Sequence, residues 1–139
     1  MTIMADATVL QFLGIKTGRG KRGLVPAPAI RFQTVDALKK RLDLDDEEAT
    51  RLSGMQRRTY QRRKASGGEL TQGEADATLR SARIAKEALA TFGDRARAME
   101  WIKSPSAFLG AAPIDLMASD AGARAVEQEL ARIHWGDFA

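Results

Sequence analysis

The chain has 139 residues, of which 44% are apolar and 29% charged, a composition ordinary for a globular protein of one or two small domains. It contains no cysteine and one histidine, which excludes disulfides, thiolate metal sites and a cysteine nucleophile. No apolar run approaches the ~20 residues of a membrane-spanning helix. The N-terminus also lacks the pattern of a secretory signal, so we expect a cytoplasmic protein without membrane contact.

The net charge of +4 at pH 7 is unevenly distributed along the chain. Basic residues are in excess over residues 1–33, whereas residues 94–139 are mildly acidic. Residues 49–68 contain six Lys or Arg side chains and no acid. This distribution predicts one polyanionic partner and one partner of another kind.

Residues 1–33 are predicted to form an arm outside the main fold. Glycines interrupt its basic run and give the backbone too much freedom for a helix. The Pro26–Pro28 stretch favours an extended backbone. Two alternatives follow: a disordered tail, or docking of the apolar Val9–Ile15 patch on a partner or on the domain itself. In the second alternative the residues that contact phosphate are Lys16, Arg19, Lys21 and Arg22.

From Thr34 onward the pattern is helical, and no strand-like alternation is convincing, so the predicted fold class is all-α. Val35, Leu38 and Leu42 form one apolar stripe of a first helix. A second helix begins at the acidic run 45–48, where the helix dipole favours negative charge, and ends at Gly54.

A third helix is predicted over Gln56–Lys64, and after a break a long helix starts at Thr71 and reaches Phe92. This long helix is our expected dimer contact. Gly93 separates a C-terminal module with helices over residues 96–103, near Pro113, and over residues 121–133, the last capped by Ser119 or Asp120. The predicted domains are therefore the arm 1–33, a DNA-binding region 34–93, and a module 94–139.

The second and third helices, joined by a turn with Gly54, have the pattern of a helix-turn-helix. Tyr60 is predicted to face the core together with Met55, rather than to stack on a base. Arg pairs with guanine and Gln with adenine in the major groove, while other cations bind phosphate. The candidate DNA-binding residues are Gln56, Arg57, Arg58, Gln61, Arg62, Arg63 and Lys64. The alternative is a solvated basic helix, which the lack of neighbouring acids in the sequence argues against.

Residues 34–139 resemble the Xre/ParS/MbcA-type antitoxins of bacterial type II toxin–antitoxin systems. In the DNA-binding half the resemblance rests on "LSGMQRRTYQRRK" and "GGELTQGEADATLR". In the C-terminal half it rests on Trp101, Pro105, Leu109, Gly110, Pro113, Asp115, Leu116, Gly122, Val126, Leu130, Ile133 and Gly136. Ala111 replaces a usual glycine and Met117 a usual leucine, and the arm lies outside the resemblance.

The resemblance implies an Xre-like helix-turn-helix domain followed by a small helical toxin-binding module. It implies a partner toxin with a RES domain that degrades NAD or transfers ADP-ribose from it. The antitoxin would cover the toxin's active site and, as a homodimer within a higher-order complex, repress its own operon by binding operator DNA.

The aromatic chain end is the candidate toxin contact, because aromatic anchors with nearby charge are typical interface hot spots. The candidate toxin-binding residues are Arg132, His134, Trp135, Asp137 and Phe138. We expect residues 134–139 to plug the toxin's nucleotide cleft. The alternative is that Trp135 packs back on its own module.

No catalytic centre can be assembled from the sequence, because His134 is the lone histidine and no cluster of metal ligands is visible. We therefore expect no enzyme activity, cofactor, metal or small-molecule substrate. The competing function is a stand-alone helix-turn-helix regulator whose C-terminal module dimerises or senses a ligand.

Overall fold

The computed structural model describes residues 3–18, 20 and 22–136, and its fold is mostly helical. The elements in chain order are β1 (Ile3–Asp6), α1 (Ala7–Phe12), β2 (Leu24–Ala27), α2 (Phe32–Leu42), α3 (Asp46–Ser53), α4 (Arg57–Ser66), α5 (Gln72–Phe92), α6 (Arg95–Lys103), the 3-10 turn η1 (Pro113–Asp115) and α7 (Asp120–His134). The helices from α2 onward lie where the sequence predicts them, and the all-α class is confirmed.

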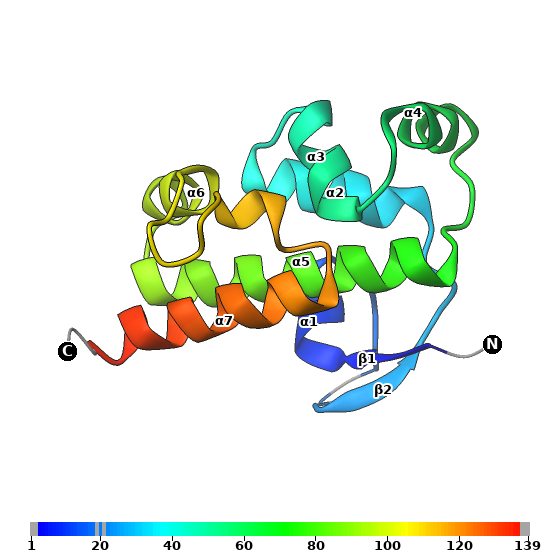
Figure 1. The fold of residues 1–139 in the computed structure, drawn as a ribbon. Coiled ribbons are helices and arrows are strands. Elements are labelled where there is room, and N and C mark those ends of the chain that lie inside the picture. Colours follow the sequence, from blue (N-terminus) through cyan, green and yellow to red (C-terminus); the bar gives the residue numbers. More distant parts are fainter. Residues whose placement is uncertain (1–2, 19, 21, 137–139) are drawn as a thin grey trace.

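The long helix α5 lies at the centre of the molecule, with α2, α3 and α4 on one side and β1 and β2 on the other (Figure 1). It packs against α1, α2, α3, α6 and α7. Its buried face is made largely of alanine, which lets the neighbouring helices approach closely. Because so much of α5 is covered by the chain itself, the structure gives no support to the expectation that this helix carries the dimer contact.

Side-chain caps fix the helix boundaries. Asp45 begins α3 in a capping box with Glu48, and Thr71 begins α5 in a second one with Glu74. Ser119 caps α7 by accepting a hydrogen bond from the backbone N–H of Gly122 at 3.0 Å. These local contacts explain why the helix starts were readable from the sequence.

The prediction that no strand forms is wrong at the N-terminus. β1 pairs with β2 in an antiparallel sheet, with Ala5 opposite Val25. Four-residue strands carry too few alternating positions to be recognised in the sequence. The pair is stabilised by packing, because Ala5, Val25 and Leu10 are buried against the helices.

The N-terminal arm therefore docks on its own domain over the described residues, and the expectation of a disordered tail is corrected. Val9, Leu10 and Leu13 are at most 5% exposed. Of the four cations expected near phosphate, Arg19 and Lys21 lie outside the described residues. Lys16 and Arg22 lie in the connection between α1 and β2. The strand β2 lies on the opposite side of α5 from α4 (Figure 1).

One hydrophobic core runs from the N-terminal part to the C-terminal part. It includes Leu52 of α3, Ile84 of α5, Ile102 of α6 and Val126 of α7. Polar contacts cross the same junction: Lys103 pairs with Glu48 at 2.9 Å. The boundary proposed at Gly93 is thus a turn between two helices of a continuous core.

Candidate functional site

The helix-turn-helix consists of α3, a three-residue turn and α4. Gly54 ends α3 in the left-handed conformation at φ 67°, where a side chain would be strained. Met55 follows and is buried in the core. Gln56 is the N-cap residue of α4, but its side chain makes no capping hydrogen bond. Ala49 and Leu52 of α3 are buried behind this turn.

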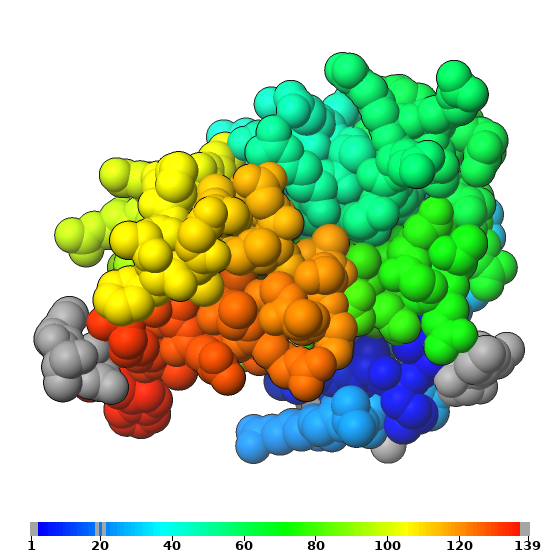
Figure 2. Space-filling view, viewed as in Figure 1, coloured from blue at the N-terminus to red at the C-terminus, as the bar shows by residue number. Residues whose placement is uncertain are grey.

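The outer face of α4 is polar, cationic and open to solvent. Figure 2 shows the region of α4 projecting from the upper right of the molecule. The exposed members of the predicted DNA-binding set are Gln56, Arg57, Arg58, Gln61, Arg62 and Lys64. The structure therefore brings six of the seven predicted residues to the surface of one helix.

Tyr60 anchors the inner face of α4 and is 1% exposed, so its predicted place in the core is confirmed. Its ring meets Phe32 edge-on, with 5.2 Å between the ring centres. Its hydroxyl donates a hydrogen bond of 2.8 Å to Asp46, and burial raises the pKa of the phenol well above its usual value. This anchoring leaves no free ring for base stacking.

Asp46 holds α4 against α2 and α3. Besides Tyr60, its carboxylate binds Lys64 at 2.6 Å and Lys39 at 3.0 Å. Hydrogen bonds from Lys64, then Lys39 and Tyr60, hold the pKa of Asp46 far below its usual range. The expectation that no acid compensates the cations of α4 is thus wrong for Lys64, because Asp46 of the neighbouring helix α3 pairs with it.

Arg63 does not belong to the exposed face. It pairs with Glu74 of α5 at 3.0 Å, and the two side chains are 22% and 14% exposed. It also donates to the carbonyl of Glu69 at 3.1 Å. Arg63 therefore holds the C-terminal end of α4 against the start of α5. Lys64 is exposed but forms an ion pair with Asp46.

The C-terminal end carries an exposed aromatic side chain. Trp135 is 81% exposed, so the alternative in which it packs back on the module is not what the structure shows. The ring of His134 meets it edge-on at 5.0 Å. Arg132 is half-buried, and Asp137 and Phe138 lie outside the described residues.

Phe108, in the loop between α6 and η1, is 73% exposed and was missed by sequence reasoning. The guanidinium of Arg132 lies 4.1 Å from the centre of its ring. The loop "SPSAFLGAA" gave no signal for it, because apolar residues next to Leu109 and Ala112 are ordinarily core.

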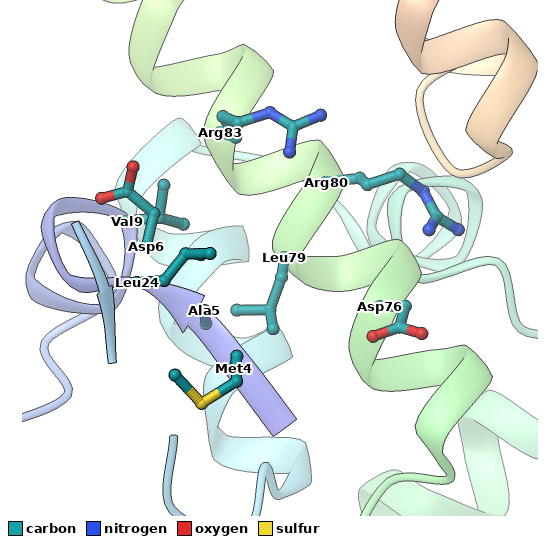
Figure 3. Close-up of a pocket in the computed structure, with 9 residues that line it drawn as sticks. All are labelled: Met4, Ala5, Asp6, Val9, Leu24, Asp76, Leu79, Arg80 and Arg83. Carbon is teal, nitrogen blue, oxygen red and sulfur yellow. The ribbon is translucent and has the colours of Figure 1, made fainter. Parts of the chain in front are cut away.

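A separate hollow lies between β1 and α5. Figure 3 shows Met4, Leu24 and Leu79 facing it, while the guanidinium groups of Arg80 and Arg83 turn away from β1. Arg80 donates to the carbonyl of Ala118, and Arg83 pairs with Glu127. Arg83 thus connects α5 to α7, and Arg80 connects α5 to the residue just before the cap of α7. Both guanidinium groups are bonded there instead of adding positive charge to the hollow.

Within the part of the chain that the structure describes, no group of three His, Asp or Glu side chains is placed to hold a metal. The same residues include no helix long and apolar enough to cross a bilayer.

Comparison with known proteins matches both halves of the chain. Residues 27–86 match the model of the antitoxin Xre-like helix-turn-helix domain. Residues 87–136 match the model of the antitoxin Xre/MbcA/ParS C-terminal toxin-binding domain. The two models meet within α5, seven residues before the boundary that the sequence predicted after Gly93.

Two curated relatives are both named antitoxin Xre. The one from Photorhabdus laumondii is 33% identical over 88 residues, which is 62% of this chain and 60% of the relative. The one from Yersinia enterocolitica is 27% identical over 124 residues, 85% of this chain and 84% of the relative. The chain thus matches about three fifths of the first relative's length and most of the second's.

Proposed function

The chain belongs to the Xre/MbcA/ParS-type antitoxins, and we propose that it neutralises a RES-domain toxin in the cytoplasm and represses its own operon. The observation that carries the proposal is the separation of two different surfaces on one core. The face of α4 is cationic and polar, whereas the end of α7 exposes the large aromatic side chain of Trp135.

The DNA-binding part of the proposal rests on the outer face of α4. Arg57, Arg62 and Gln61 have the donor groups that read guanine and adenine in a major groove. The core anchors on the inner face hold the helix rigidly while these side chains stay free to reach a base edge. We propose that two copies bind an inverted repeat, since a single small module rarely binds tightly enough alone.

The toxin-binding part rests on the chain end. Trp135 projects from the C-terminus of α7, inside the matched toxin-binding domain. We propose that residues 134–139 enter the nucleotide cleft of the toxin, which acts on NAD by hydrolysis or by ADP-ribose transfer. The chain's own role is to bind and cover that cleft, without chemistry of its own.

The test is co-expression of the chain with the product of the adjacent gene, followed by gel filtration. The proposal predicts a joint peak, and a variant cut after His134 should lose both the joint peak and protection of growth. The proposal fails if the intact chain elutes alone as a dimer, as a stand-alone regulator would. It also fails for the chain end if the shortened variant neutralises fully.

A further inference from the structure

The loop between α6 and η1 holds Phe108 rigidly in solvent. The N–H of Gly110 donates to the carbonyl of Ser106 at 2.9 Å, and the N–H of Ser106 donates to the carbonyl of Ala111 at 3.1 Å. These bonds close a tight loop, and Leu109 packs against the main core. The backbone at Phe108 is therefore fixed, although its side chain is 73% exposed.

Arg132 supports the ring of Phe108 from α7. Its guanidinium lies 4.1 Å from the ring centre, a cation–π contact. Glu129, which is 8% exposed, accepts two hydrogen bonds from the same guanidinium, at 3.0 and 2.7 Å. The carboxylate of Glu129 offsets the charge of this guanidinium, so Arg132 adds little net charge beside the ring of Phe108. This surface is thus unlike the cationic face of α4, and it favours a protein surface over a polyanion as its partner.

Phe108 lies in the same matched domain as Trp135. Four large apolar side chains are exposed among the described residues, namely Met4, Leu24, Phe108 and Trp135. Only the last two fall within residues 87–136, the toxin-binding domain. Arg132 and Trp135 are three residues apart at the end of α7, so they are neighbours on the helix surface. Figure 2 shows the loop before η1 directly beside the end of α7.

We propose that Phe108, supported by Arg132, is a second anchor for the toxin, separate from the chain end beyond Trp135. This inference rests on the proposed function. The anchor fits an apolar, uncharged pocket on the surface of a folded protein. Aromatic and arginine side chains are enriched among interface hot spots. A ring already held in place loses little conformational freedom on binding, which favours affinity.

The experiment titrates the full-length chain into the purified product of the adjacent gene and measures the dissociation constant by biolayer interferometry. Phe108→Ala should weaken binding about 30-fold or more, the threshold of a hot-spot residue. Phe108→Tyr keeps the ring and should bind within about threefold of the wild type. Leu24→Ala, which removes another exposed apolar side chain outside the domain, is the matched control and should bind unchanged. The melting temperature of Phe108→Ala should match the wild type, because the ring is exposed.

Three results would overturn the inference. If the wild type binds and Phe108→Ala binds equally well, the second anchor does not exist and the proposed function stands. If Phe108→Ala instead reduces self-association in light scattering and leaves toxin affinity unchanged, the patch belongs to a second copy of this chain. If the wild type itself does not bind, the inference and the proposed function fail together.

Discussion

At the scale of single residues, Asp46 is the side chain that decides where α4 lies. It accepts from Tyr60 and pairs with Lys39 and Lys64, so one carboxylate joins α2, α3 and α4. Because the carboxylate is partly exposed, solvent screens these pairs, and each contributes modestly. Their sum still fixes the orientation of the helix that we propose to read DNA.

We predict that Asp46→Asn lowers the free energy of unfolding by about 1 kcal/mol at pH 7. The pKa of Asp46 is lowered by folding, so its contribution is present above the usual value of 3.8 and is lost as the pH falls below it. Urea denaturation at several pH values should therefore show the wild type and the variant converging in acid. Asp36→Asn, which removes an exposed pair with Lys40, is the control and should have little effect at any pH. A constant gap between wild type and Asp46→Asn down to pH 3 would contradict this account.

Gly122 lies where any side chain would collide with backbone. A Cβ atom there would be 2.1 Å from the carbonyl oxygen of Leu116 and 2.6 Å from the hydroxyl of Ser119. We predict that Gly122→Ala costs about 1–3 kcal/mol of stability, as overpacking does. Gly73→Ala, also near a helix start but with open space around it, should be neutral or slightly stabilising. Equal melting temperatures for the two variants would contradict the expectation that a Cβ atom at position 122 collides with its neighbours.

The role of a residue could be predicted where its spacing along one helix determines the face on which it lies. The role could not be predicted where it depends on a partner from another part of the chain. Tyr60 was placed in the core because its spacing from Gly54 sets its face on the helix. The partners of Asp46 and Arg63 come from other helices, which no local pattern records. Phe108 was missed because the outward direction of a loop side chain depends on hydrogen bonds that only the folded loop makes.

At the scale of elements, the basic residues of α4 fall into two groups: exposed ones that we propose to bind DNA, and one that packs within the fold. Arg57 and Arg62 are exposed, whereas Arg63 is paired with Glu74 and half-buried. The expectation that all seven residues contact DNA is therefore narrowed to a proposal that the exposed residues contact DNA and that Arg63 holds the end of α4 in place. The two roles can be distinguished by measurement, because loss of an exposed arginine should lower DNA affinity and loss of Arg63 should lower the stability of the fold.

We predict that Arg57→Ala or Arg62→Ala weakens operator binding by about 1–3 kcal/mol and relaxes base preference where that residue reads a base. Neither should change the melting temperature. Arg63→Ala should instead lower stability, because it leaves Glu74 without its partner at the start of α5. Fluorescence anisotropy with labelled DNA and thermal melting of the same samples check both effects. An unchanged footprint after replacing Arg57, Arg58 and Arg62 together would remove α4 from the interface.

Elements with capping residues and apolar stripes could be predicted, and the short strands could not. The Thr71 and Asp45 caps mark helix starts within a few residues. β1 and β2 depend on burial of Ala5 and Val25 by helices that follow much later in the chain. Their formation is therefore a tertiary effect.

At the scale of the whole molecule, the DNA-binding part and the toxin-binding part share one core. Leu52 of α3 and Ile114 of η1 belong to the same cluster, and Lys103 of α6 pairs with Glu48 of α3 at 2.9 Å. We predict that the monomer unfolds in a single transition, since the largest buried cluster packs α3 and α5 against α6, η1 and α7 and so includes both parts. Urea curves followed by tryptophan fluorescence, which reports Trp101 and Trp135, and by circular dichroism should coincide. Two separated transitions would contradict the shared core.

The central claim is that toxin neutralisation and DNA binding use different ends of this molecule. The most direct measurement is the growth of cells that express the product of the adjacent gene together with variants of this chain. Growth should be restored by the wild type and by the chain with Arg57, Arg58 and Arg62 all changed to Ala, but not by the chain cut after His134. Growth arrest with the α4 variant, or full growth with the shortened chain, would contradict the account.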